Sequence, residues 1–85
     1  MFSVRYSKQS TKALCKMPHK IALRIQAEIL RIADNPTAYS GDWKRLEGTG
    51  FWRLRVGGWR AVCDVQNGEL LILVLKIASR GDEYK

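Results

Sequence analysis

Apolar and polar residues alternate at the amino terminus, where polar side chains separate Phe2, Val4 and Tyr6. This period of two residues predicts a half-buried strand. Ser7 follows the strand and is a good N-cap residue, because its hydroxyl can accept a hydrogen bond from the first turn of a helix. We therefore predict a helix over Lys8–Lys16 directly after it.

A second helix is predicted between Pro18 and Asn35. Proline suits the first turn of a helix, and the Asn35-Pro36 pair ends it, because the residue before a proline avoids helical geometry. Between these limits four isoleucines recur at helical spacing and form one apolar stripe: Ile21, Ile25, Ile29 and Ile32. The two helices are joined at Met17-Pro18, so we expect a helical hairpin.

Three strands separated by two turns follow in the carboxyl-terminal half. The predicted strands are Phe51–Val56, Trp59–Gln66 and Glu69–Ile77. They are separated by Gly57-Gly58 and Asn67-Gly68, dipeptides that favour the positive-φ turns of tight hairpins. The pattern therefore predicts a three-stranded antiparallel meander.

The remaining segments complete the expected architecture. Residues Thr37–Gly50 are predicted to be a loop with an extended stretch at Asp42–Leu46. The run Leu70–Leu75 is apolar on both sides, which predicts a central strand covered on both faces. The order is β-α-α-β-β-β, so we expect one α+β domain over residues 1–85, with the helical hairpin packed on one face of a mainly antiparallel sheet.

Composition restricts the protein class. The chain has 85 residues and a net charge of +7, with 15 Lys and Arg against 8 Asp and Glu. Its longest apolar run is too short to cross a bilayer, and its first residues do not form a signal peptide, so we expect a cytoplasmic protein with no membrane partner. We expect no metal site and no cofactor, because the chain has a single histidine, His19, and two cysteines that lie far apart, Cys15 and Cys63. Both cysteines are interpreted as small buried apolar residues.

The positive charge falls into two groups. The first group lies mainly on the predicted helices, where Lys8, Lys12 and Lys16 recur every four residues along one exposed face. The second group is rich in arginine, and on a strand Arg53 and Arg55 would point away from the core.

Arginine clusters suit phosphate recognition, because the guanidinium group donates paired hydrogen bonds. The predicted hairpin brings Arg60 near Arg53 and Arg55, and Arg80 follows the last strand towards the same end of the sheet. Tyr84 could stack on a base or donate its phenolic proton. These residues predict a phosphate-binding surface; the alternative is a set of solvated arginines that serve solubility.

At these residues the sequence resembles the RelE/ParE toxin superfamily of bacterial toxin–antitoxin systems. The resemblance is carried by Leu46-Glu47-Gly48, by Phe51–Val62 and by Leu75–Lys85, together with the helical hairpin that ends in Ala33–Pro36. It spans nearly the whole chain. No single motif is highly specific, but their ordered combination is.

On the RelE side the resemblance implies a ribosome-dependent endoribonuclease that cuts mRNA in the ribosomal A site. In this reaction a ribose 2′-OH attacks the adjacent phosphate. Arg60 matches the arginine that stabilises the scissile phosphate, and Arg80 matches the arginine assigned to phosphate or leaving-group stabilisation. Tyr84 matches the carboxyl-terminal tyrosine that stacks on or orients the nucleotide.

The main departure from the family lies at Arg53 and Arg55, which stand where well-known members have lysines acting as base and phosphate ligand. An arginine stays protonated near neutrality and is a poor general base. Lys44, Lys76 or the ribosome itself then remain as sources of the base. Besides the expected catalytic residues Arg53, Arg55, Arg60, Arg80 and Tyr84, the residues expected to bind RNA are Lys44, Arg45, Lys76, Lys12 and Lys16.

Two other functions remain open. A ParE-like inhibitor of DNA gyrase would share the fold without needing phosphate-transfer residues, and a degenerate member would act only as an antitoxin-binding corepressor. The partners that the resemblance implies are a cognate antitoxin, the ribosome and mRNA. We expect an acidic or apolar antitoxin segment to wrap the basic surface, with electrostatic attraction speeding the association.

Overall fold

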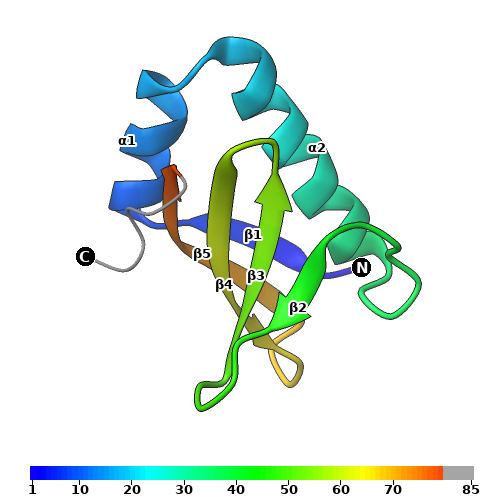
Figure 1. Ribbon diagram of the computed structural model, residues 1–85. Helices are drawn as coiled ribbons and strands as arrows, with labels where there is room; N and C mark the ends of the chain where they lie inside the picture. The colour runs from blue at the N-terminus through cyan, green and yellow to red at the C-terminus, as the bar shows by residue number, and fades with distance from the viewer. Residues whose placement is uncertain (80–85) are drawn as a thin grey trace.

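The computed structural model describes residues 1–79, which form a five-stranded sheet and two helices (Figure 1). The strands lie in the order β1-β5-β4-β3-β2; β1 runs parallel to β5, and all other neighbours are antiparallel. The α+β class and the mainly antiparallel sheet are thus confirmed. The elements in chain order are β1 (Ser3–Tyr6), α1 (Lys8–Lys16), α2 (His19–Asp34), β2 (Trp43–Arg45), β3 (Phe51–Val56), β4 (Trp59–Gln66) and β5 (Leu71–Ser79).

Both predicted helices are confirmed, and their ends have local causes. The Ser7 hydroxyl oxygen accepts a hydrogen bond from the backbone N–H of Ser10 at 3.1 Å, so α1 begins where the cap predicts. Pro18 precedes α2, and Asn35 leaves the helical conformation after it. Figure 1 shows that a short connection joins the end of α1 to the start of α2, so that the two helices form a hairpin.

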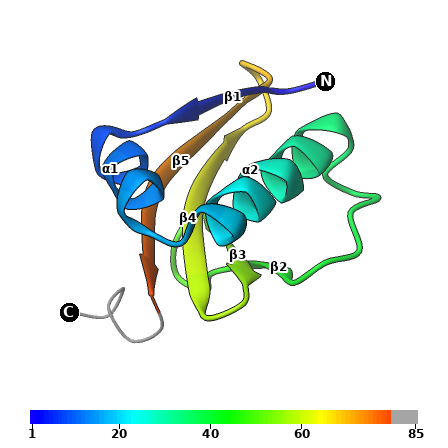
Figure 2. The same ribbon diagram turned by 90° about the horizontal axis from the view of Figure 1, so that it is seen from above.

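Helix α1 lies beside β5 and covers its free edge (Figure 2). Strand β1 pairs only with the first half of β5, so the backbone groups beyond Val74 need other partners. The Ser10 hydroxyl donates to the Val74 carbonyl at 3.0 Å. The Gln9 amide donates to the Ile77 carbonyl at 3.1 Å and accepts from the Ile77 N–H at 3.0 Å. These side chains replace a neighbouring strand and protect the edge from pairing with another chain.

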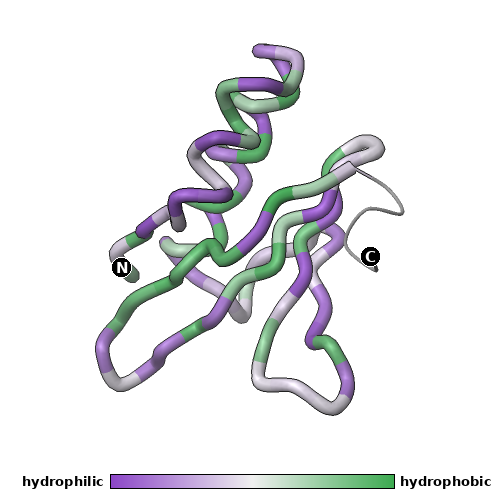
Figure 3. Tube along the Cα trace, turned by 90° about the vertical axis from the view of Figure 1, so that its left-hand side faces the viewer, coloured by the Kyte–Doolittle hydropathy of each residue, from purple (hydrophilic) through white to green (hydrophobic). Residues whose placement is uncertain are grey.

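The hydrophobic core lies between α2 and the sheet. Three of the four predicted isoleucines of α2 are fully buried, and Ile21 at the start of the stripe is half-buried. In Figure 3 the helices alternate between green and purple along their length, as expected for elements with one apolar stripe. The sheet contributes the inward-facing residues of its inner strands to the core: Leu54, Val56, Ala61, Cys63, Ile72, Val74 and Ile77.

The prediction that the apolar run of β5 is covered on both faces is wrong. Strand β5 does have strands on both sides, and Ile72 and Val74 are fully buried beneath the helices. Leu71 and Leu73, on the opposite face, are only half-buried. No helix or strand among residues 1–79 covers that face, and its leucines are shielded by their neighbours in the sheet, as Leu73 is between Arg5 and Asp64.

The two hairpin turns differ from each other. Gly57 has φ 60°, and this positive φ at the first central residue is typical of a two-residue type II′ turn. In the second turn the positive φ falls on Leu70, at 50°, and not on Gly68. The turn therefore spans Asn67–Leu70, and β5 begins two residues later than predicted.

The two cysteines also differ, and the prediction that both are buried is wrong for one of them. Cys63 is completely buried in the core, whereas Cys15 is exposed on α1. Only a small part of α1 packs against the sheet, since the polar Ser10 is the one buried residue of this helix. Burial raises the pKa of the Cys63 thiol to about 12.

We expect this difference to appear in thiol reactivity. At a pH of about 8, a thiol whose pKa is raised stays protonated, and the thiolate is the reactive form. The native protein should therefore react with an aromatic disulfide reagent at Cys15 only, and at both cysteines after denaturation. Cys63→Ala should leave the fast reaction unchanged. Two fast-reacting thiols in the native protein would contradict the burial of Cys63.

Candidate functional site

The sheet face turned away from the helices carries a cationic surface, which we call the cationic face: Lys44, Arg53, Arg55, Arg60 and Lys76. Arg53 and Arg55 alternate along β3 with the buried Leu54 and Val56, so their side chains lie opposite the core, as predicted. The register of β3 and β4 places Arg60 directly opposite Arg55. The predicted proximity of Arg60 to the two arginines of β3 is therefore confirmed.

Arg55 and Arg60 line a small pocket at the end of the β3–β4 hairpin. Its volume is about 150 Å³, and its other walls are Gly57 and Gly58. The glycines leave the pocket open at the turn because they have no side chains. Two guanidinium groups on the walls of one pocket make it suited to an anion.

Asp42, which sequence analysis did not single out, is the acidic partner of these arginines. Its Oδ1 accepts a hydrogen bond from the Arg53 Nη2 at 2.9 Å, and its Oδ2 lies 3.7 Å from the Arg55 Nε. The side chain of Arg53 is 17% exposed and that of Arg55 is 43% exposed. Arg53 is thus held in the sheet by its carboxylate partner, whereas Arg55 is freer to meet a ligand.

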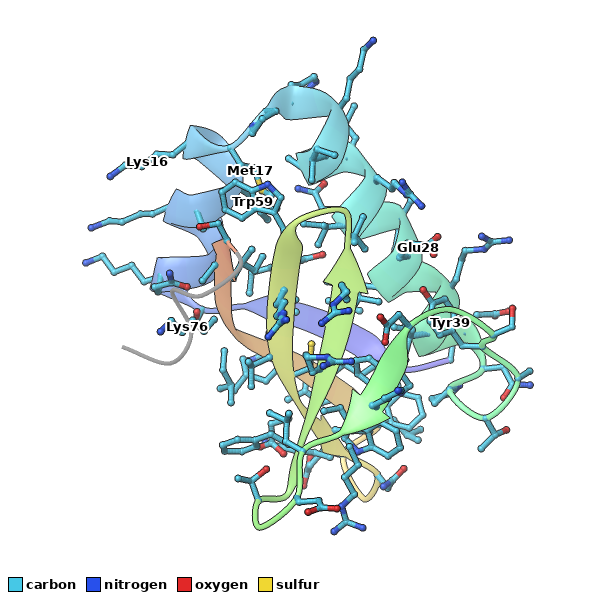
Figure 4. All side chains as sticks on the ribbon, in the orientation of Figure 1. Lys16, Met17, Glu28, Tyr39, Trp59 and Lys76 are labelled. Carbon is cyan, nitrogen blue, oxygen red and sulfur yellow. The ribbon has the colours of Figure 1, made fainter. Side chains whose placement is uncertain are left out.

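The loop before β2 is anchored so that Asp42 reaches β3. The Tyr39 hydroxyl donates a hydrogen bond to the Glu28 Oε1 of α2 at 2.7 Å, and the two side chains lie together in Figure 4. This bond lowers the pKa of Glu28, and burial together with Glu28 raises the pKa of Tyr39 to about 12. Gly41 packs against the Tyr39 ring so closely that a Cβ there would collide with it. The Asp42 carbonyl then accepts from the Arg55 N–H at 3.0 Å.

Asp42 could have been found from the sequence only if the pairing of β2 with β3 had been known. It lies two residues before Lys44, and alternation puts both on one face of an extended segment. The register pairs Lys44 with Arg53, which brings Asp42 beside Arg55. The sequence contains no local signal that fixes this pairing.

The predicted RNA-binding residues of the sheet fall on different faces. One row across four strands joins Lys44, Arg53, Val62 and Lys76, so both lysines lie on the cationic face. Arg45 is paired with Trp52 and lies on the other face. There the rings of Trp52 and Trp43 are stacked with centroids 5.2 Å apart.

A groove between α1 and the end of β5 continues the cationic face. The groove has a volume of about 440 Å³, and Lys12, Lys16, Trp59 and Lys76 are among its lining residues. Figure 4 shows Lys16 and Lys76 on the side of the molecule away from Glu28 and Tyr39. The structure thus brings Lys12 and Lys16 of α1 together with Lys76 of β5, which belongs to both surfaces.

Two predicted catalytic residues, Arg80 and Tyr84, lie outside the described residues. Within residues 1–79, no three side chains of the types His, Cys, Asp or Glu come together in a way that could hold a metal ion. No helix in the same part of the chain is long and apolar enough to cross a membrane.

The contacts of the two β3 arginines predict unequal effects on stability. Arg53→Ala should lower the free energy of unfolding by about 1.5–3 kcal/mol, because it removes a charge-assisted hydrogen bond that is largely shielded from water. Arg55→Ala should lower it by about 0–1 kcal/mol, the usual range for an exposed ion pair. Urea denaturation of both variants measures the difference. Equal losses would contradict the role of Asp42 as a specific partner of Arg53.

The chain is similar to known toxins in both sequence and structure. A family model described as the ParE toxin of the type II toxin–antitoxin system parDE matches residues 4–84. No curated protein sequence matches the chain. The structure is similar to that of the archaeal RelE–RelB complex from Pyrococcus horikoshii OT3, with 30% identity, a TM-score of 0.81, and coverage of 94% of this chain and 96% of that one.

Two further solved structures share the fold at lower identity. The intact RelBE toxin–antitoxin complex of E. coli has 15% identity and a TM-score of 0.77, covering 93% of this chain and 96% of that one. The RelBE2 complex from Mycobacterium tuberculosis has 20% identity and a TM-score of 0.74, covering 93% and 98%. The family match and the archaeal relative together show that this chain belongs to the RelE/ParE superfamily, within the family of ParE toxins of type II toxin–antitoxin systems.

Proposed function

We propose that this toxin is a ribosome-dependent endoribonuclease that cleaves mRNA in the ribosomal A site. The observation that supports this most directly is the pair Arg55 and Arg60, which face each other on adjacent strands and line one pocket. Two guanidinium groups converging on one small pocket suit a phosphate, because each donates hydrogen bonds in a fixed planar geometry. The proposed inhibition of translation follows from the loss of intact mRNA.

In the proposed reaction the arginines stabilise charge on the scissile phosphate. Attack by the ribose 2′-OH produces a pentavalent phosphorus with additional negative charge, and preorganised donors stabilise such a transition state. Arg55 and Arg60 contact this phosphate, and Arg53 supports the site through Asp42. Arg80 and Tyr84 are retained as active-site residues on the basis of the family resemblance.

The groove beside α1 extends the proposed RNA path. Lys12 and Lys16 are one helical turn apart, and Lys76 connects their groove to the cationic face. Trp59, which is half-buried, offers part of its indole ring as a surface for stacking. Lys44 extends the path on the other side of Arg53, whereas Arg45 points to the opposite face and is left out of it.

We further propose that a cognate antitoxin neutralises the toxin. The relative from Pyrococcus horikoshii is a RelE toxin in complex with RelB. The net charge of +7 attracts an acidic segment, and the half-buried leucines beside the cationic face offer apolar contacts to it.

Inhibition of DNA gyrase is the second candidate function, because the matching family model describes ParE toxins. A gyrase supercoiling assay distinguishes the two. Loss of supercoiling with trapped cleaved DNA, while mRNA on ribosomes stays intact, would replace the nuclease proposal. Harmless expression of the toxin without any antitoxin would instead favour a corepressor.

The nuclease proposal predicts a specific dependence on Arg60. In a cell-free translation reaction mapped by primer extension, Arg60→Ala should reduce mRNA cleavage about 100-fold or more, the usual loss when one transition-state donor is removed. Arg24→Ala is the matched control, because Arg24 is an exposed arginine on α2. Equal cleavage by the Arg60 and Arg24 variants would exclude Arg60 from the active site.

The groove predicts a salt-dependent contribution to RNA binding. Lys12→Ala combined with Lys16→Ala should weaken binding to a 2′-O-methyl RNA oligonucleotide, which cannot be cleaved by its own 2′-oxygens. The slope of log affinity against log salt should fall by about 1.4, because each phosphate contact to a single strand contributes about 0.7.

Lys8→Ala combined with Lys20→Ala is the charge-matched control for this experiment. Both lysines are exposed on the same helical hairpin, and neither lines the groove. Anisotropy titrations at several salt concentrations compare the two double variants. Identical slopes would mean that the lysines act only through net charge.

A further inference from the structure

The proposed reaction needs a group that accepts the proton of the 2′-OH, and the arginines cannot be that group. A guanidinium has only donors and stays protonated in proteins. This excludes Arg53, Arg55 and Arg60 as bases, although they bind phosphate well. The inference that follows rests on the proposed nuclease function.

Asp42 has the position and the available carboxylate oxygen that a proton acceptor requires. It begins a row across three strands, because its backbone pairs with Arg55 and Arg55 is paired with Arg60. Its Oδ1 is engaged by Arg53 at 2.9 Å, whereas its Oδ2 has a looser contact of 3.7 Å with Arg55. Its side chain is 35% exposed, so a substrate can reach it.

The geometry of RNA matches this row. The attacking 2′-oxygen belongs to the ribose that carries the scissile phosphate, so the base must lie close to the phosphate site. Neighbouring strands are separated by about 4.8 Å. Arg55 is one strand away from Asp42 on the same face, so a ribose on the Asp42 side of a phosphate held by Arg55 and Arg60 is within reach of the carboxylate.

The two lysines considered from the sequence are less suited to this role. Lys76 lies on the strand next to Arg60, but it pairs with Val62 and so stands two residues away from the row of Arg55 and Arg60, and it lines the groove of α1. Lys44 is next to Arg53 but is exposed, and burial is the usual way in which a protein makes a lysine basic near neutrality. A carboxylate needs no such adjustment, since aspartate side chains as a class are ionised at neutral pH.

We propose that Asp42 is the general base of this toxin. Its Oδ2 takes the proton of the 2′-OH while the 2′-oxygen forms a bond to phosphorus. The bond between phosphorus and the 5′-oxygen breaks, and the electron pair leaves with the 5′-oxygen, which takes a proton from water. The protonated Asp42 returns its proton to the resulting hydroxide. The products are a 2′,3′-cyclic phosphate and a free 5′-hydroxyl, and no water is consumed.

The test is single-turnover cleavage of mRNA on programmed ribosomes by the full-length toxin. Asp42→Asn keeps an oxygen that can accept from Arg53 but cannot take a proton, so cleavage should slow about 100- to 10,000-fold. Asp42→Glu should recover part of this loss. Asp34→Asn is the matched control, because Asp34 is an exposed acid at the end of α2.

The pH dependence separates a base from a residue that only positions Arg53. Asp42 is flanked by Arg53, Arg55 and Lys44, and a carboxylate base there should give a rate that is flat between pH about 6 and 8. The residual rate of Asp42→Asn should rise with pH, because hydroxide then removes the proton. Lys44→Met should weaken binding but keep the flat profile.

Several results would overturn this assignment. Wild-type rates for Asp42→Asn, or a wild-type rate that rises about tenfold per pH unit as for a lysine base, would exclude Asp42 as the base. In both cases the wild-type toxin cleaves mRNA, so the proposed function stands. A wild-type toxin that leaves ribosome-bound mRNA intact would overturn the function and this inference together. If the urea midpoint of Asp42→Asn is near that of the wild type, its loss of cleavage is not caused by a loss of folding.

Discussion

The pairing register of β3 and β4 is the constraint on which the candidate site depends. A two-residue turn at Gly57 joins the two strands and sets this register, because the positive φ of Gly57 lets the chain reverse within two residues. Because side chains alternate along a strand, a slip of one residue would move Arg55 into the core and Leu54 out of it. The buried apolar residues of β3 thus hold the arginines on the open face, and core packing and the candidate phosphate site are fixed by one set of hydrogen bonds.

This arrangement carries an electrostatic cost that the structure partly offsets. Arg55 and Arg60 are like charges in directly opposed positions, which destabilise a sheet. Asp42 contributes a carboxylate to the same row and binds Arg53 more closely than Arg55. Arg53 is therefore held by Asp42, whereas Arg55 and Arg60 line the small pocket. A row of one acid and two arginines matches a reaction in which a hydroxyl is deprotonated beside a phosphate.

The fold also explains why helical lysines join the arginines of the sheet. Strand β1 is short, so the second half of β5 lacks a neighbouring strand, and α1 takes that place through Gln9 and Ser10. This contact brings Lys12 and Lys16 beside Lys76 and forms a groove. The lysine spacing on α1 alone predicts only an exposed basic face.

Local patterns predicted much of the fold. The start of α1 followed from Ser7, the end of α2 from Asn35-Pro36, and the face of Arg53 and Arg55 from alternation with apolar residues. Patterns failed where a residue's surroundings come from distant segments. Cys15 was expected in the core but lies on the exposed side of α1, and the leucines of β5 were expected under cover that no described element provides.

The sequence by itself determined both helices, four of the five strands in their order, the turn at Gly57 and the resemblance to a toxin superfamily, because each depends on residues close together in the chain or on their ordered combination; of β2 it predicted only an extended stretch within a loop. Only the tertiary structure decided which residues share the site. Asp42 reaches Arg53 across eleven positions because Tyr39 is tied to Glu28 of α2 and β2 pairs with β3. Such contacts depend on packing between distant segments, which no local pattern of residues encodes.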